Sequence, residues 1–261
     1  MIRGAVGTTG IAYRVDGPST APAIVLLNSL GTTHGMWEWQ LPALRDWRVV
    51  RYEHSGHGES ELRAGIVSME ALGDDLMALM DHVGVERAVL CGCSMGGLLA
   101  LRAAATQPDR VLGVVLANTG ARVGTFEGWN ARISAVRDGG MAAIRDGVVR
   151  RFLSDGFRGA HPEVVANIEA MLDGVDPHGY ASVCEALRDA DFRPLVPLVR
   201  VPTLVVAGAF DESTPPALGE ALHAGIEGSR LEVLPTAHLS MVELPGAFNA
   251  VLLGFLDRLG R

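Results

Sequence analysis

Residues 88–97 constrain the fold of this chain most, because they place Ser94 in a Gly-x-Ser-x-Gly pattern between an apolar run and a helical one. A serine at a tight strand-to-helix turn has strained backbone angles, and the strand and helix approach so closely that the flanking positions tolerate little side chain. Gly92 and Gly96 supply that room. The pattern predicts that Ser94 is a nucleophile raised above a sheet. It also predicts that the backbone N–H of Met95, at the positive end of the following helix, faces a developing oxyanion.

The composition is typical of a soluble enzyme with one large α/β domain. Of the 261 residues, 48% are hydrophobic, which supplies a sizeable core and argues against disorder. The net charge of −8 disfavours nucleic acids and anionic membrane surfaces as partners. No apolar run approaches the length of a membrane span, and the first residues lack the apolar segment of a secretory signal. We therefore expect a cytoplasmic protein with buried, reduced cysteines.

Predicted strands and helices alternate along most of the chain, which is typical of a mostly parallel sheet between two helical layers. Apolar positions at helical spacing predict helices over residues 69–83 and 248–259. Besides the strand before Ser94, the predicted strands cover residues 11–15, in an antiparallel edge hairpin, and residues 24–27, 48–52, 111–117, 203–207 and 231–234.

One segment, from about residue 120 to 197, breaks this alternation and contains only helical patterns. Helices are predicted there over residues 129–136, 141–152, 162–172 and 177–187. We interpret the segment as a cap inserted over the carboxyl edge of the sheet, where open α/β sheets bind ligands. The expected domains are therefore a core of residues 1–119 and 198–261 and a helical cap of residues 120–197.

A serine nucleophile needs a general base, and the base needs a carboxylate that orients it. In a sheet of this kind both partners follow late strands, in the chain order Ser, Asp or Glu, His. Asp211 and His238 stand at those places. The other position for the acid holds Asn118, which carries no charge. Glu212 is the nearest rival, and we expect it to point outward at the start of the following helix.

The remaining motifs give little support for a metal site or a nucleotide-binding site. His54 and His57, with Glu53, superficially resemble a metal cluster, but they lie in a glycine turn without a third ligand nearby. We interpret them as a hydrogen-bonded turn. The glycines around Ser94 lack the middle glycine of a dinucleotide fingerprint. No metal or cofactor is therefore expected.

These motifs together resemble the α/β-hydrolase superfamily over nearly the full length of the chain. More narrowly, the chain is similar to the 3-oxoadipate enol-lactone hydrolases of bacterial aromatic-acid catabolism. The segments that carry this resemblance are Asn28-Ser29-Leu30-Gly31-Thr32, Met36-Trp37, Gly56-His57-Gly58-Glu59-Ser60, Cys91-Gly92-Cys93-Ser94-Met95-Gly96-Gly97-Leu98, Asn118-Thr119-Gly120-Ala121-Arg122, Glu127-Gly128-Trp129-Asn130-Ala131-Arg132, Ala207-Gly208-Ala209-Phe210-Asp211 and Ala237-His238-Leu239-Ser240.

The resemblance implies an α/β-hydrolase fold and a serine hydrolase that opens a small, carboxylated enol-lactone through an acyl-enzyme, without cofactor or metal. It implies that the backbone N–H of Leu30 is the second oxyanion donor beside Met95. An anionic substrate of an acidic protein needs a local cation, and the cap segment is rich in arginine. We choose Arg132, because it follows Trp129 by three residues on the same helical face within a family-like stretch.

The sequence departs from the family pattern at three places, and each departure bears on the choice of substrate. Glu53-His54-Ser55 replaces an Asp-x-Arg pattern, and Phe210 stands where a polar residue is usual. Phe152-Leu153-Ser154-Asp155 replaces the usual Trp-Phe-Thr-Pro of the cap. Two alternatives therefore stay open, namely another ester, lactone or carbon–carbon bond hydrolase on the same triad, and a triad-bearing ligand receptor.

Overall fold

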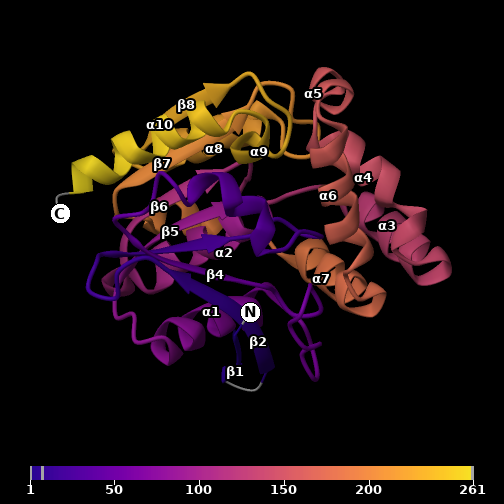
Figure 1. Ribbon diagram of the computed structural model, residues 1–261, viewed down its shortest axis with the longest axis horizontal. Helices are drawn as coiled ribbons and strands as arrows, with labels where there is room; N and C mark the ends of the chain where they lie inside the picture. The colour runs from indigo at the N-terminus through magenta and orange to yellow at the C-terminus, as the bar shows by residue number, and fades with distance from the viewer. Residues whose placement is uncertain (1, 7–8, 260–261) are drawn as a thin grey trace.

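The computed structural model describes residues 2–6 and 9–259, and it contains a single eight-stranded sheet (Figure 1). The strand order is β1-β2-β4-β3-β5-β6-β7-β8. Only β2 runs against its neighbours, so the predicted edge hairpin and the predicted mostly parallel sheet are both confirmed. The strands are β1 (Ile2–Val6), β2 (Thr9–Asp16), β3 (Ala23–Leu27), β4 (Arg48–Tyr52), β5 (Ala88–Cys93), β6 (Val111–Ala117), β7 (Thr203–Gly208) and β8 (Arg230–Leu234).

Helices of the core cover the sheet in two groups (Figure 1). In one group α1 packs on α2, and η4 joins α2 to α8. In the other, α9 and α10 pack on η1, where Trp37 contacts Phe248. β3 and β5, buried along their whole length, lie at the centre of the sheet, as continuous apolar strands should. The core helices are η1 (His34–Gln40), α1 (Met69–His82), α2 (Met95–Thr106), η2 (Pro108–Arg110), α8 (Pro216–Gly225), α9 (Ser240–Glu243), α10 (Pro245–Leu256) and η5 (Asp257–Leu259). The short helix η4 (Arg193–Leu198) spans the boundary between residues 120–197 and the second part of the core.

Residues 120–197, which we call the cap segment, are helical throughout their regular structure and lie to one side of the sheet (Figure 1). Within them α3 packs on α7, and α4 packs on α6. We propose that they form one cap unit between the two parts of the core. Their helices are α3 (Phe126–Gly139), η3 (Met141–Ala143), α4 (Arg145–Phe152), α5 (Asp155–Ala160), α6 (Pro162–Asp173) and α7 (Pro177–Asp189).

The cap segment differs from the sequence analysis in one predicted helix and in one helix that was not predicted. The helix predicted over residues 141–152 is interrupted at Ile144, whose φ of −116° departs from helical geometry, and it becomes η3 and α4. The apolar spacing continues across this break, so the sequence pattern hides it. The short helix α5 was not predicted, because its two glycines weaken the helical pattern, yet the Ser154 side chain caps it by accepting the Phe157 N–H.

The cap segment touches the core through a close approach of two backbones. The N–H of Asp176 donates to the carbonyl of Gly56 at 3.0 Å, and the Asp176 side chain in turn caps α7. A Cβ atom added to Gly179 in α7 would lie only 2.8 Å from the Cα of Gly56. The contact therefore requires glycine at this helical position. Among the described residues, no helix is long and apolar enough to cross a membrane.

We expect Gly179→Ala to lower the free energy of unfolding by roughly 1 kcal/mol or more, since the overpacked contact outweighs the helix propensity of alanine, which is worth about 1 kcal/mol. Gly156→Ala, in α5, is the matched control because a Cβ there meets nothing within 4 Å. Urea unfolding of both variants measures the difference. Equal stability of the two variants would contradict this account of the contact.

Candidate active site

Ser94 occupies the sharp turn between β5 and α2, with φ of 56° and ψ of −115°. This left-handed backbone is strained for a residue with a side chain. A Cβ at Gly92 would lie 2.2 Å from the Gly96 oxygen, and one at Gly96 would lie 2.3 Å from the Leu27 oxygen. The two close approaches expected at Gly92 and Gly96 therefore hold Ser94 above the carboxyl end of the sheet.

His238 and Asp211, from the loops after β8 and β7, form a buried pair. His238 Nδ1 lies 2.8 Å from Asp211 Oδ2, and the two residues are 1% and 3% exposed. Burial alone raises the pKa of Asp211, but the charge of His238 and the hydrogen bonds from His238 and Thr214 outweigh it and hold the pKa below its ordinary value. The carboxylate is thus built to remain ionised beside the imidazole.

Asn118 supports this carboxylate, a role that the sequence did not reveal. Its Nδ2 donates to Asp211 Oδ2 at 3.1 Å and to the carbonyl of Ala237 at 3.2 Å. The residue directly follows β6 and has a φ of 47°, a conformation that asparagine tolerates better than most residues. Asn118 therefore stands at the position where an alternative acid was possible, and its side chain holds Asp211 in place.

Glu212 differs from the sequence expectation. It is exposed, as expected, but α8 begins only at Pro216, so Glu212 lies in the preceding loop rather than at a helix start. It also lines the mouth of the cavity described next. Pro215 precedes α8 and Pro216 is its first residue, so Glu212 stays in the loop that lines the cavity.

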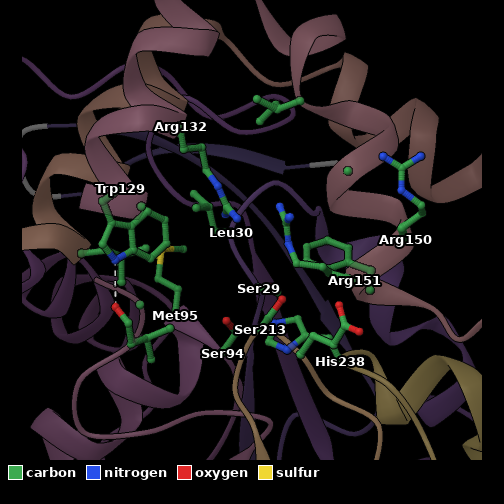
Figure 2. A pocket seen from close by; sticks show the side chains of 18 of the residues that line it. Ser29, Leu30, Ser94, Met95, Trp129, Arg132, Arg150, Arg151, Ser213 and His238 are labelled. Atoms are coloured by element: carbon green, nitrogen blue, oxygen red, sulfur yellow. Dashed lines mark hydrogen bonds between the residues drawn. The ribbon is translucent and has the colours of Figure 1, made fainter. Parts of the chain in front are cut away.

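A cavity of about 790 Å³ lies between the carboxyl end of the sheet and the cap segment. Ser94 and His238 lie at its base beside each other, while Trp129 and Arg132 descend from α3 (Figure 2). The predicted site residues that line it are Leu30, Ser94, Met95, Trp129, Arg132 and His238, with Asp211 behind His238.

Comparison with known proteins agrees with this geometry. Residues 22–244 match the family model described as alpha/beta hydrolase fold. The chain belongs to the alpha/beta hydrolase fold family. The resemblance seen in the sequence is thereby confirmed.

Two curated relatives and one solved structure are similar over nearly their whole length. The chain is 37% identical to 3-oxoadipate enol-lactonase 1 of Acinetobacter baylyi, covering 98% of this chain and 96% of that protein. It is 39% identical to 3-oxoadipate enol-lactonase 2 of the same organism, covering 94% and 92%. The crystal structure of the enol-lactonase from Burkholderia xenovorans LB400 superposes with a TM-score of 0.96 at 41% identity, covering 98% of this chain and 100% of that one.

Phe152 of this hydrolase forms a wall of the cavity directly against the histidine. Its ring stacks on the His238 imidazole with centroids 5.3 Å apart and an interplanar angle of 23°. The Phe152 carbonyl also accepts the N–H of Leu239 at 3.0 Å. The sequence marked Phe152 only as a departure from a family pattern, because nothing local links it to a histidine that lies far along the chain.

The arginines of the cap segment divide by whether they face the cavity. The arginines on the outer surface of the cap segment form ion pairs with acidic side chains. These pairs are Arg122–Asp191, Arg137–Glu185, Arg145–Asp173, Arg158–Asp155 and Arg188–Asp189. The cavity-lining Arg132, Arg150 and Arg151 make no ion pair with any described residue. Asp146 and Glu212 line the same cavity, so its wall combines three arginines outside any ion pair with two carboxylates.

Two of these cavity arginines approach each other. Arg132 lies over the Trp129 ring at 5.0 Å, and the guanidinium ends of Arg132 and Arg151 both point into the space above Ser94 (Figure 2). Burial, followed by the charge of Arg132, lowers the pKa of Arg151. Two like charges in a partly desolvated wall repel each other, and a bound anion would relieve that repulsion.

The turn with His54 and His57 is a buried hydrogen-bonded turn, as expected. His57 Nε2 accepts the Gly31 N–H at 3.0 Å, and its Nδ1 lies 3.0 Å from the Ser55 carbonyl. Burial lowers the pKa of His57, which suits a neutral ring that accepts a hydrogen bond. His57 thus holds the loop that carries Leu30. In the described part of the chain, no group of three or more potential metal ligands gathers.

Sequence reasoning found no partner for His34, but the structure gives it one. His34 Nδ1 lies 2.8 Å from Glu53 Oε1. Glu53 is buried and its other oxygen accepts the Glu59 N–H at 2.5 Å. This pair fastens η1 to the loop after β4, away from the cavity lining.

Proposed function

We propose that this protein is a serine hydrolase that opens a small enol-lactone bearing a carboxylate, converting 3-oxoadipate enol-lactone to 3-oxoadipate. The observation that carries the proposal is the meeting, in one cavity, of Ser94 and the His238–Asp211 pair with arginines that lack acidic partners. The names of the similar curated proteins support the same substrate. We therefore derive the reaction from this cavity.

In the proposed first step, His238 acts as general base for Ser94. Because Nδ1 of His238 is held by Asp211, Nε2 is the ring nitrogen left to face the serine. His238 takes the Ser94 proton as the oxygen attacks the lactone carbonyl, and the ionised Asp211 stabilises the imidazolium. Phe152 shields the ring from water on one face, which strengthens this charge interaction.

The negative charge that develops on the carbonyl oxygen needs donors fixed in advance. We assign the backbone N–H groups of Met95, at the start of α2, and of Leu30, in the loop after β3. The bond between Gly31 and His57 fixes that loop. Each such donor is worth about 3 kcal/mol of transition-state stabilisation.

His238 then donates the proton it took from Ser94 to the ring oxygen, which leaves as an enol while the acyl group stays on Ser94. In a lactone the leaving group remains tethered and would close the ring again. Conversion of the enol to its ketone removes that nucleophile, so the reaction proceeds forward. His238 next removes a proton from water, which attacks the acyl-enzyme, and the proton returned by His238 frees Ser94.

Arg132 is the proposed ligand of the substrate carboxylate, with Arg151 beside it. Both belong to the group of cavity arginines without an acidic partner in the described residues. A planar guanidinium suits a carboxylate, and Trp129 holds that of Arg132 in place. An anion bound between the two guanidinium groups would offset the repulsion between them.

Turnover of the enol-lactone tests the proposal. We expect Ser94→Ala to lower kcat about 10⁴-fold or more, because the nucleophile is lost and only binding and the oxyanion donors remain. Ser213→Ala is the control, since Ser213 lines the same cavity and its backbone N–H, not its hydroxyl, bonds Asp211. The control should stay within a few-fold of wild type. Sustained turnover by Ser94→Ala would overturn the proposed function.

The acid is tested by two isosteric variants in adjacent positions. Asp211→Asn removes the charge that stabilises the imidazolium, and we expect a loss of about 10⁴-fold in kcat. Glu212→Gln removes an exposed charge at the cavity mouth and should change kcat only a few-fold. Steady-state kinetics of both variants decide the assignment, and the reverse order of losses would place the acid at Glu212.

Substrate charge is tested by comparing two substrates. Arg132→Ala should lower kcat/KM for the carboxylated lactone about 10- to 150-fold, the value of a charge-assisted hydrogen bond, yet barely change a neutral p-nitrophenyl ester. Arg137→Ala is the matched control on α3, because Arg137 pairs with Glu185 outside the cavity. Equal losses on both substrates would show that Arg132 is structural rather than a carboxylate ligand.

A further inference from the structure

Glu243 is a buried carboxylate outside the proposed triad. It ends α9, is 7% exposed and forms no ion pair with the described residues. Its two oxygens bond two different parts of the chain. Oε1 accepts the N–H of Ser154 in the cap segment at 2.5 Å, and Oε2 accepts the N–H of Ala237 in the core at 3.2 Å.

This position is costly for a carboxylate. Burial raises the pKa of Glu243, the two peptide N–H groups and the Ser154 hydroxyl oppose that rise, and the nearby charge of Asp211 adds to it. A buried carboxylate that is held by hydrogen-bond donors without a cation is energetically costly. Because both oxygens of Glu243 accept hydrogen bonds, the side chain links the cap segment rigidly to the core.

The link lies directly beside the proposed general base. Ala237, which bonds Glu243, immediately precedes His238, and Leu239, which immediately follows it, donates to the Phe152 carbonyl at 3.0 Å. The Phe152 ring stacks on His238 itself. The backbone on both sides of the histidine is therefore tied to the stretch 152–154 of the cap segment.

We propose that Glu243 is a positioning residue that ties the His238 loop to the cap segment, so that the cap sets the place of the general base. The inference rests on the proposed function of His238. Arg151, one of the proposed anion ligands, immediately precedes Phe152 in the same stretch. An anionic substrate bound by Arg151 thus acts on the segment that holds His238, which couples recognition of the substrate carboxylate to the geometry of proton transfer.

The core side of the link is tested by Glu243→Gln, which keeps the size of the side chain but turns an NH₂ group toward one of the two N–H donors. We expect kcat per active site to fall about 10- to 100-fold, the effect of a displacement of about 1 Å in a catalytic group, with KM changed less than about threefold. Active sites are counted by intact mass after complete reaction with a fluorophosphonate. Glu220→Gln, an exposed carboxylate on α8, is the control.

A purely structural role would leave a different signature. The variant would then show a lower unfolding temperature and fewer reactive sites, but a wild-type kcat for each site that reacts. That result overturns the inference. So does a wild-type kcat in a fully reactive Glu243→Gln.

The cap side of the link is tested at Ser154, whose φ of −64° matches proline. Ser154→Pro removes the N–H that Glu243 accepts, whereas Ser154→Ala keeps it and loses only the hydroxyl. We expect the proline variant to lower kcat per site by a factor similar to that of Glu243→Gln, and the alanine variant to stay within a few-fold of wild type. Equal kcat values of the proline and alanine variants would contradict the link.

The double variant of Ser154→Pro with Glu243→Gln decides whether the two residues act together. A shared link predicts a combined loss well below the product of the single losses, whereas independent effects multiply and would overturn the inference. Ser94→Ala, measured alongside, separates this inference from the proposed function. If Ser94→Ala is inactive while Glu243→Gln turns over normally, only the inference fails; if Ser94→Ala turns over, the proposed function itself fails.

Discussion

The close approach of β3, β5 and α2 is the constraint on which the rest of the structure depends. No atom larger than hydrogen fits on Gly92 or Gly96, because backbone oxygens lie 2.2 and 2.3 Å from where a Cβ would stand. That clearance allows Ser94 its left-handed backbone between a buried strand and a helix. The strain is local, and the buried packing of the central strands holds it in place.

Beyond this turn, the proposed chemistry depends on where the parallel strands end. β3, β5, β7 and β8 are parallel, so the loops that carry Leu30, Ser94, Asp211 and His238 open on the same edge of the sheet. The cap segment covers that edge and adds arginines that form no ion pair with a described residue. A chain with a net charge of −8 thereby places three arginines in the wall of the cavity where an anionic substrate is proposed to bind.

The sequence predicted those features that depend on neighbouring residues. Strands β4 and β6 coincide with the predicted ranges, and α7 begins at residue 177 as predicted, because its aspartate cap and its first proline are both local. The contacts made by Asn118, Phe152 and Glu243 were not predictable in this way. Each joins residues far apart in sequence, as the 89 positions between Ser154 and Glu243 illustrate, and no periodicity or spacing records such a meeting.

The central claim is that Ser94 carries the acyl group, and mass spectrometry of a trapped intermediate tests it most directly. The enzyme is mixed with a slowly deacylating p-nitrophenyl ester, quenched in acid and digested. Our account predicts one added acyl group per chain, located on Ser94, and no added mass in Ser94→Ala. An acyl group on another residue, or sustained turnover by an enzyme that never acquires one, would contradict it.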